Sequence, residues 1–571
     1  MVENLIIHPG IFLIFLFVIY DLLPKSITKV TVISAPIVSY LMFYFRAKYE
    51  APDSLFYYQG HTFSLVTFFL IVLLAGILFA FNNSNDRNND IKFSLLYCGA
   101  ALSAIVTNSM IVSFAFIEVM LLAATFLIFN GHTKSSRSIG ISYFKIHMLS
   151  GTMLFIGIML HYLEYKSFSI TKFDLLDFSS STSIEVILSR WMILVALLIN
   201  LGIAPFSYWL SEGYAASSPV GSVFLSAYTT KVAIFLLTQI FIGNKALIYI
   251  GIFMGVYGII YSAIENNLRK IISFNIISQS GLILIALGIG DAAAKDSAML
   301  MAINGTIYTA LAMMCMGVVI ISTNKQIYSQ INHILYDSKF VFLCCASGLA
   351  SLGAIPFTGG YIGKYLLYRS EYLVINPWLK YVITSISTGI MFSVTIKVLI
   401  LTFITDFKYQ EHDHDKKENT ESTSLSTYGV FALFILAFFS IITGIIPEIL
   451  LHIKIDIFDT TGKDSILLFL GALAGFLVAQ KFIIHHGKST LLQPDWIYRH
   501  GLFKVYCFFS NIVFYCHSWI LRFKDKEHSR FTDIANSMFG KYGVLVFIKT
   551  QQNFIVIAII VLIIFFINSI Y

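Results

Sequence analysis

The sequence predicts an all-α fold, a polytopic transmembrane helical bundle of about 14–17 spans with a broken helix around 205–219. Hydrophobic residues make up 57% of the 571 residues, and the mean hydropathy is +0.80. Only 12% of the residues are charged, against about 25% in ordinary soluble domains. Many apolar runs approach the roughly 20 residues that span a bilayer. The lipid bilayer is therefore the expected surroundings of the chain.

Spanning helices are expected at the apolar runs between short polar loops. The expected ranges are 5–23, 28–46, 63–81, 92–107, 110–130, 141–162, 186–209, 218–242, 246–264, 269–290, 296–322, 339–358, 379–405, 426–452, 464–485 and 551–570.

Three parts are distinguished: a transmembrane domain over 1–485, a cytoplasmic or interfacial segment over 486–550 and a C-terminal transmembrane helix over 551–571. The middle part mixes basic residues with aromatic clusters, which predicts an interfacial helix near 502–521. The alternative is that this helix spans the membrane. The first residues, MVENLIIHPG, lack a basic region and are interpreted as the start of a retained helix.

The remaining composition excludes several classes of function. The net charge of +7 is spread over many loops, which indicates positive-inside bias and no nucleic-acid partner. The chain has no P-loop, no GxGxxG at a strand–helix junction and no haem or iron–sulfur spacing. The six cysteines form no CxxC motif, and the loop Glu411–Asp415 is interpreted as solvated. No cofactor, metal or soluble catalytic domain is expected.

The most informative stretch runs from Leu201 to Gln239. An apolar helix breaks at Pro205, and a second apolar helix starts near Pro219 with Lys231 in its middle. A lysine at that depth costs about 2.5–3.5 kcal/mol, so it should face protein or water and have a counter-charge. Snorkelling to the surface is the alternative. A non-helical turn is expected around Glu212–Ser218. The residues assigned to the break are Pro205, Trp209, Glu212 and Pro219.

Other ionisable residues lie within or beside the expected spans. Glu118 is flanked by apolar residues on both sides, and a buried carboxylate without a partner would stay protonated. Lys145 and His147 are two residues apart and point to different faces, with interfacial placement as the alternative. The candidate proton-carrying residues are Glu118, Lys231, Lys145, His147, Lys270, Lys364 and Lys397.

Two of these candidates have specific alternatives. Lys397 lies in a long apolar run, where snorkelling is the other interpretation. Lys270 lies in a group with Glu265 and Arg269, which are four residues apart and can pair on one helix face. A plain charged turn between two spans is the alternative there.

Several motifs resemble one family: the antiporter-like subunits shared by Mrp-type cation/proton antiporters and the membrane arm of respiratory complex I. The most specific block is APFSYWLSEGYAASSPVGSVFLSAYTTKVAIFLL, whose SAYTTK form is similar to the Mrp D subunit. The similarity covers most of 90–405 and a short C-terminal patch. Its further motifs are ENNLRKIISFNIISQSG, SLGAIPFTGGYIGKY, YFKIHMLSG and LLQPDWIYR.

The resemblance implies roles for single residues. Glu118 matches the family's glutamate and Lys231 the lysine that pairs with it, a pair thought to gate proton movement. A carboxylate within about 4–6 Å favours a charged lysine, whereas burial disfavours it, so separating the pair would release a proton. We therefore expect the two groups within direct or water-bridged reach. Gly305 and Thr309 stand where the family has a histidine and a lysine, which removes its central titratable relay.

The expected function is that of a multi-pass subunit of a monovalent cation/proton antiporter complex in the inner, energy-coupling membrane. Its expected partners are the other subunits, protons and, as a candidate coupled ion, Na+. It is not expected to be an enzyme by itself. The alternatives are a proton-pumping membrane-arm subunit of NADH:quinone oxidoreductase (complex I), a non-conducting scaffold paralogue, and a subunit that energises inorganic-carbon uptake.

Overall fold

A computed structural model describes residues 8–49, 61–82, 88–131, 133–173, 184–331, 339–404 and 425–447. All of them belong to one compact unit, Met1–Ser489, whereas a second unit, Thr490–Tyr571, lies outside the described residues. The expected helices at 464–485 and 551–570, the segment 486–550 and the loop 411–415 also lie outside them. Of the described residues, 85% are helical and none lies in a strand, which confirms the all-α fold.

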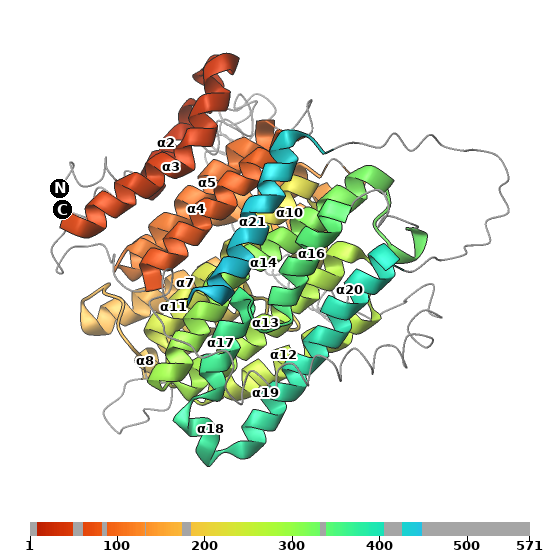
Figure 1. The fold of residues 1–571 in the computed structure, drawn as a ribbon. Coiled ribbons are helices and arrows are strands. Elements are labelled where there is room, and N and C mark those ends of the chain that lie inside the picture. The colour runs from red at the N-terminus through yellow and green to blue at the C-terminus, as the bar shows by residue number, and fades with distance from the viewer. Residues whose placement is uncertain are drawn as a thin grey trace, which may run out of the picture. The chain divides into compact units, whose positions relative to one another are not determined.

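The helices run side by side along much of their length (Figure 1). In chain order they are α2 (Pro9–Ile19), η1 (Tyr20–Leu22), α3 (Lys25–Tyr49), α4 (His61–Ala80), α5 (Asn88–Val106), α6 (Met110–Phe129), α7 (Lys134–Tyr165), α8 (Ile184–Leu201), α9 (Tyr208–Ala216), α10 (Pro219–Ala227), α11 (Thr229–Ile240), α12 (Ala246–Ile264), α13 (Leu268–Ile289), α14 (Ala292–Thr323), η2 (Tyr328–Gln330), α16 (Lys339–Leu352), α17 (Gly359–Tyr368), α18 (Glu371–Ile375), α19 (Pro377–Ile390), η3 (Met391–Ile396), α20 (Lys397–Leu399), η4 (Ile400–Ile404) and α21 (Thr427–Ile445).

Within the described ranges, 11 helices are long and apolar enough to cross a membrane, and two shorter apolar helices accompany them. Each expected span up to the one beginning at 426 overlaps at least one helix, and those at 186–209, 218–242 and 379–405 are each divided among two or more. No expected span corresponds to α17, which carries Lys364 and packs against α14. Its ten residues are too few to be recognised as a span by length.

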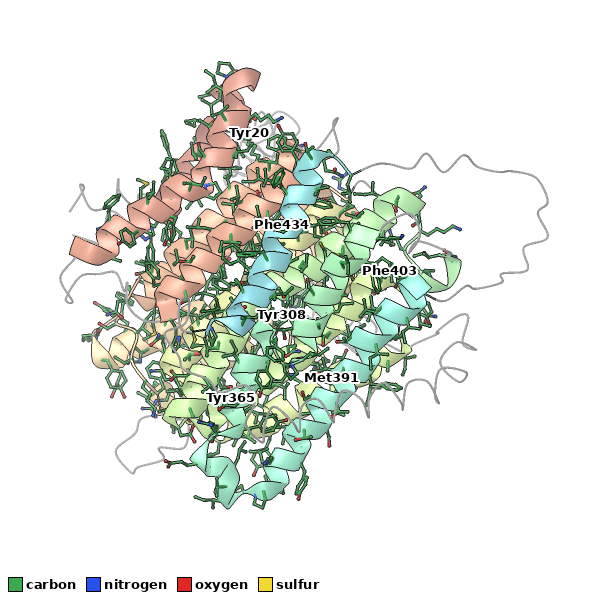
Figure 2. All side chains as sticks on the ribbon, in the orientation of Figure 1. Tyr20, Tyr308, Tyr365, Met391, Phe403 and Phe434 are labelled. Atoms are coloured by element: carbon green, nitrogen blue, oxygen red, sulfur yellow. The ribbon has the colours of Figure 1, made fainter. Side chains whose placement is uncertain are left out.

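The helices differ in how far they are enclosed. The most apolar stretches of Pro219–Ile240 and of α13 are fully buried, whereas only 39% of the corresponding stretch is buried in α12 and in α21. The exposed side chains of α21 are large and apolar, and Phe434 among them is 54% exposed (Figure 2). Such faces suit contact with lipid, whereas polar residues belong inside the bundle. The enclosed helices are therefore the ones able to hold buried charges.

The predicted broken helix around 205–219 is confirmed, but its inner arrangement differs from the expectation. Helix α8 ends at Leu201, and a second interruption falls at 217–218, so the short helix α9 contains Glu212. The predicted non-helical turn at Glu212–Ser218 was therefore wrong. Each of the two prolines interrupts a helix at its own position, but the residues between Pro205 and Pro219 remain free to form the short helix α9. Pro219 is the first residue of α10. The Ser218 hydroxyl accepts a hydrogen bond from the Gly221 N–H at 2.8 Å and so caps α10.

Candidate functional site

Lys231 lies in the first turn of α11, directly after an interruption at Tyr228 that the sequence did not reveal. The residue is 3% exposed, which excludes snorkelling to the surface. Its Nζ donates to the carbonyl oxygen of Ser226 at 2.7 Å and to Thr309 Oγ1 at 3.4 Å. The last carbonyls of a helix lack intrahelical donors and carry partial negative charge. The end of α10 therefore supplies Lys231 with its shorter hydrogen bond.

Helix α14 forms the facing wall of this site through Gly305 and Thr309. A Cβ at Gly305 would stand 3.5 Å from Cε of Lys231. The Thr309 hydroxyl lies 2.6 Å from the Gly305 carbonyl oxygen and 3.3 Å from that of Ser226. The two positions that depart from the family pattern thus border Lys231. A long side chain at position 305 would compete with the lysine for the same space.

Glu118 lies on α6, and its carboxylate rests against Gly151 of α7. A Cβ at Gly151 would meet Oε1 of Glu118 at 1.9 Å, so any larger residue there would displace the carboxylate. Among the described residues, no ion pair joins Glu118 to Lys231. Of the two expected arrangements, direct or water-bridged reach, the direct ion pair is not formed in this structure, and the water-bridged one stays a prediction.

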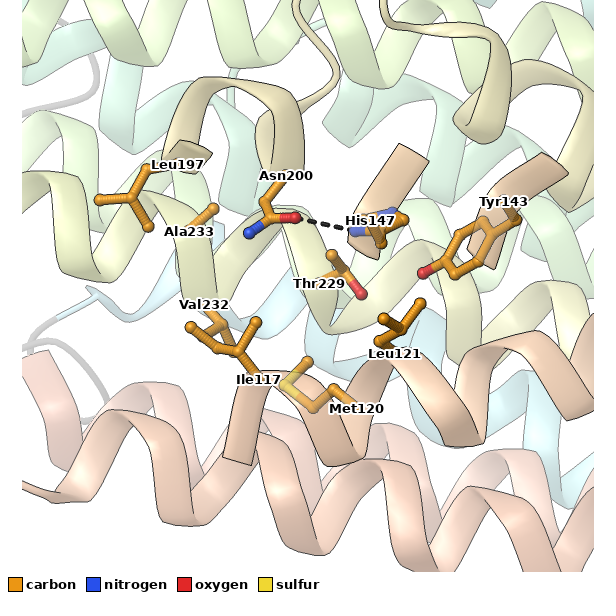
Figure 3. A pocket seen from close by; sticks show the side chains of 10 residues that line it. All are labelled: Ile117, Met120, Leu121, Tyr143, His147, Leu197, Asn200, Thr229, Val232 and Ala233. Atoms are coloured by element: carbon orange, nitrogen blue, oxygen red, sulfur yellow. Dashed lines mark hydrogen bonds between the residues drawn. The ribbon is translucent and has the colours of Figure 1, made fainter. Parts of the chain in front are cut away.

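A small cavity separates the helices of these two residues (Figure 3). Ile117 lines it on α6, next to Glu118, and Thr229 and Val232 line it on α11, on either side of Lys231. The volume that the centre of a water molecule can occupy in this cavity is about 10 Å³, which is close to what one water molecule needs. The full lining is Ile117, Met120, Leu121, Tyr143, His147, Leu197, Asn200, Thr229, Val232 and Ala233.

His147 is one of two titratable side chains that line this cavity, the other being Tyr143. It is buried, its Nδ1 lies 2.8 Å from Asn200 Oδ1, and its ring packs against Tyr143 and Trp209. Within the described part of the chain, Nε2 has no hydrogen-bond partner. Lys145, two residues earlier on α7, is exposed. The two side chains therefore point to different faces, as predicted, and only His147 faces the interior.

Sequence reasoning missed Asn200 and the hydroxyl groups around Thr229. Tyr97 hydrogen-bonds the Thr229 hydroxyl and accepts the Thr229 N–H at 3.3 Å, so it satisfies a donor at the start of α11. The available signal was an asparagine inside the apolar run before Pro205. Polar residues within a span usually face the bundle interior.

Two further lysines are buried among helices distant in sequence. Lys364 on α17 is 4% exposed and donates to Ser387 Oγ at 2.9 Å. Lys397 on α20 is 1% exposed and donates to three backbone carbonyls at the end of α12, of Ser262, Ala263 and Glu265. Snorkelling is excluded for Lys397 as well.

The charged group between α12 and α13 matches the second of its two interpretations. Glu265 follows the last residue of α12 and accepts the N–H groups of Asn266 and Asn267, whereas Arg269 belongs to α13. The Glu265–Arg269 pair is not formed, because the non-helical residues 265–267 separate α12 from α13 and four-residue spacing no longer places the two side chains on one face. The other interpretation, a charged turn between two spans, is the arrangement found. Arg269 donates instead to the Ser217 carbonyl oxygen at 2.7 Å.

The residues assigned to the break hold α9 in place. Glu212 forms an ion pair with Lys270 at 2.5 Å, and Trp209 Nε1 donates to the Ile199 carbonyl oxygen at 3.0 Å. Pro205 lies in the turn between α8 and α9. Together with Arg269, these contacts fix α9 against α8 and the start of α13.

A known family covers the part of the chain that holds this site. A family model described as "NADH:quinone oxidoreductase/Mrp antiporter, TM" matches residues 107–393, which is half of the chain. The chain belongs to this family. The match covers Glu118, the broken helix with Lys231, and Lys364, and it ends four residues before Lys397.

Relatives within the NADH:quinone oxidoreductase/Mrp antiporter family are distant. The A subunit of the Na(+)/H(+) antiporter of Alkalihalophilus pseudofirmus is 24% identical over 68% of this chain, which spans only 51% of that protein. The D subunit of the Bacillus subtilis Na(+)/H(+) antiporter is 22% identical over 53% of this chain and 63% of its own length. NADH-quinone oxidoreductase subunit N of Campylobacter jejuni is 23% identical over 59% of this chain and 75% of its own.

Solved structures agree on the fold. A chain of the Mrp complex from Dietzia sp. DQ12-45-1b aligns with a TM-score of 0.64 at 16% identity, covering 82% of this chain and 99% of that one. A chain of respiratory complex I from Thermus thermophilus aligns with a TM-score of 0.63 at 15% identity, covering 78% and 98%. These structures show the fold, and the family match together with the apolar helices shows a multi-pass membrane protein of the NADH:quinone oxidoreductase/Mrp antiporter family.

Proposed function

We propose that the chain is the proton-carrying subunit of a monovalent cation/proton antiporter complex. The observation that supports this most directly is the buried ammonium of Lys231 at a helix break, beside a cavity whose opposite wall adjoins Glu118. A charge at that depth is costly to maintain without a use. Other subunits of the same complex would be its partners, and Na+ is the candidate exchanged ion.

In this proposal, protons pass between Glu118 and Lys231 through the cavity. One water there, held by the free Nε2 of His147 and the hydroxyl groups near Thr229, would bridge part of the gap. Thr309 accepts from Lys231 on the far side but cannot store a proton. Lys270, Lys364 and Lys397 are the further groups of the proposed path, whereas the exposed Lys145 no longer has a place in it.

The test is proton flux into vesicles that hold the whole complex. Glu118→Gln keeps the size and removes the charge, and Lys231→Met keeps the length and removes the ammonium, so both should abolish coupled proton movement while the complex still assembles. Lys380→Met, on the exposed surface of α19, is the matched control. Unchanged flux in both variants would instead identify a non-conducting scaffold.

A membrane-arm subunit of complex I is the second candidate, because the chain is also similar to NADH-quinone oxidoreductase subunit N. Purification of the chain with its native partners in mild detergent separates the two. NADH-driven quinone reduction by the purified assembly would support complex I, and its absence together with Na+-dependent proton movement would support the antiporter.

A further inference from the structure

Lys397 is held in a cradle made of three backbone carbonyl oxygens. Its Nζ lies 3.0 Å from the oxygen of Ser262, 2.7 Å from that of Ala263 and 2.7 Å from that of Glu265. An ammonium has three protons to donate, so the three carbonyls satisfy it completely. All three oxygens belong to the C-terminal end of α12 and the residue that follows it.

The cradle is enclosed on its other sides. The Ser262 hydroxyl donates to Ser393 Oγ on η3 at 2.9 Å, which ties the end of α12 to the helix that carries Lys397. The Tyr328 ring lies 5.5 Å from Nζ and presents its face to the cation. Burial, with the nearby charge of Glu265 adding to it, raises the pKa of Tyr328 to about 12, so the phenol stays neutral.

The helix around Lys397 is also irregular. The residues on either side, Met391–Ile396 and Ile400–Ile404, form π-helix. This winding is rare in proteins, and where it occurs it often lies at a functional site. This winding directs a side chain of one span onto the carbonyl end of another. The described part of the chain shows no second lysine with three carbonyl partners: Lys231 has one carbonyl and Lys364 has none.

The carbonyl oxygens at the C-terminal end of α12, a helix long enough to span, point at Lys397 Nζ, and the helix dipole adds negative potential there. In transporters, unwound backbone carbonyls and helix C-terminal ends are groups that coordinate Na+. Hard cations prefer such oxygen ligands. We propose that the carbonyls of Ser262, Ala263 and Glu265 form a Na+ site that the ammonium of Lys397 occupies in this structure.

Exchange at this cradle conserves charge. Lys397 releases one proton to water as Na+ enters, and the neutral amine remains beside the ion; the reverse step returns the proton and expels Na+. The physiological meaning of this exchange rests on the proposed antiporter function. It adds to that function a site on the proposed proton path where Na+ and a proton compete. The binding itself requires no transport.

The experiment uses the purified full-length chain in lipid nanodiscs. Lys397→Ala opens the cradle, whereas Lys397→Met fills it with an uncharged chain of similar length. Thermal unfolding is compared in NaCl and in N-methylglucamine chloride at equal ionic strength, and 22Na+ binding is measured in parallel. We expect Na+ to raise the melting temperature of Lys397→Ala and to bind it saturably at one site, because a ligand of the native state stabilises it.

The controls decide the interpretation. Lys397→Met should show no Na+-specific effect, and neither should Lys364→Ala, which removes a buried lysine that has only a hydroxyl partner. Lys397→Ser, whose side chain is too short to reach the carbonyls, is a second opened variant with the same expected gain. Folded opened variants that neither bind 22Na+ nor gain stability in NaCl would overturn the proposal, as would failure of both to fold in either salt. Such a result would leave the Glu118 and Lys231 flux test untouched.

Discussion

Lys231 and Lys397 both lie where a long helix departs from regular geometry, and both are buried, but their partners come from different parts of the chain. Lys231 donates to Ser226, five residues earlier, at the end of its own broken helix. Lys397 donates to carbonyls that are 132–135 residues away in sequence, at the end of α12. One lysine bridges a break within a span, and the other joins two separate spans.

This difference has a mechanical consequence. A small change of backbone angle at Tyr228 would alter the distance between the Lys231 ammonium and the Ser226 carbonyl, because both lie beside that interruption. Lys397 cannot leave its cradle without exposing three carbonyls that have lost their donor. We therefore expect Lys231 to be the more sensitive position for transport and Lys397 the more sensitive for stability.

The largest expected effect is the loss of stability in Lys397→Met. Each buried carbonyl left without a donor costs about 1–3 kcal/mol, so three of them lower the free energy of unfolding by several times the effect of a surface change. Denaturant unfolding of the purified chain measures it, with Lys380→Met as the control. A variant as stable as the wild type would show that the cradle does not depend on the ammonium.

Next comes the loss of transport in Lys231→Met. Proton flux by the assembled complex should fall at least about tenfold, equivalent to about 1.4 kcal/mol on the barrier. Its unfolding free energy should fall less than that of Lys397→Met, because only one carbonyl loses its donor. The reverse ranking of the two variants in the stability measurement would contradict the comparison.

A smaller effect is expected from Thr309→Val, which keeps the shape of the side chain and removes the hydroxyl that accepts from Lys231. The contact is long, at 3.4 Å, so its loss should reduce flux only by about threefold, near the lower end for one hydrogen bond. Thr309→Ser retains the hydroxyl and should keep most of the flux. Equal losses in both variants would point to packing as the cause.

The smallest effect is expected for the stability of Gly305→Ala. Its Cβ would meet Lys231 and Tyr308 at 3.4–3.5 Å, an ordinary contact, and alanine gains about 0.5–1 kcal/mol over glycine in a helix. Thermal unfolding should therefore show an equal or higher melting temperature. Gly151→Ala is the contrasting variant, because its Cβ would collide with Glu118. If the Gly305 variant melted lower than the Gly151 variant, the space beside Lys231 would be tighter than this geometry implies.

Sequence reasoning succeeded where the signal was local. The burial of Lys231 and the opposite faces of Lys145 and His147 followed from apolar surroundings and helical spacing. It failed where a chain reversal intervened, because the Glu265–Arg269 spacing held no information about the break between α12 and α13. Helix α17 also produced no signal, since a helix of ten residues is shorter than a span.

The sequence by itself determined the membrane class, the helical fold and the burial of Lys231, because the cost of placing polar groups in lipid acts on each segment separately. Only the tertiary structure decided the partners of those residues. The Lys397 cradle, the Glu212–Lys270 ion pair and the Gly151 surface against Glu118 all join residues that lie far apart in the chain. Such contacts depend on which helices pack together and at what register, which the pattern of one segment does not encode.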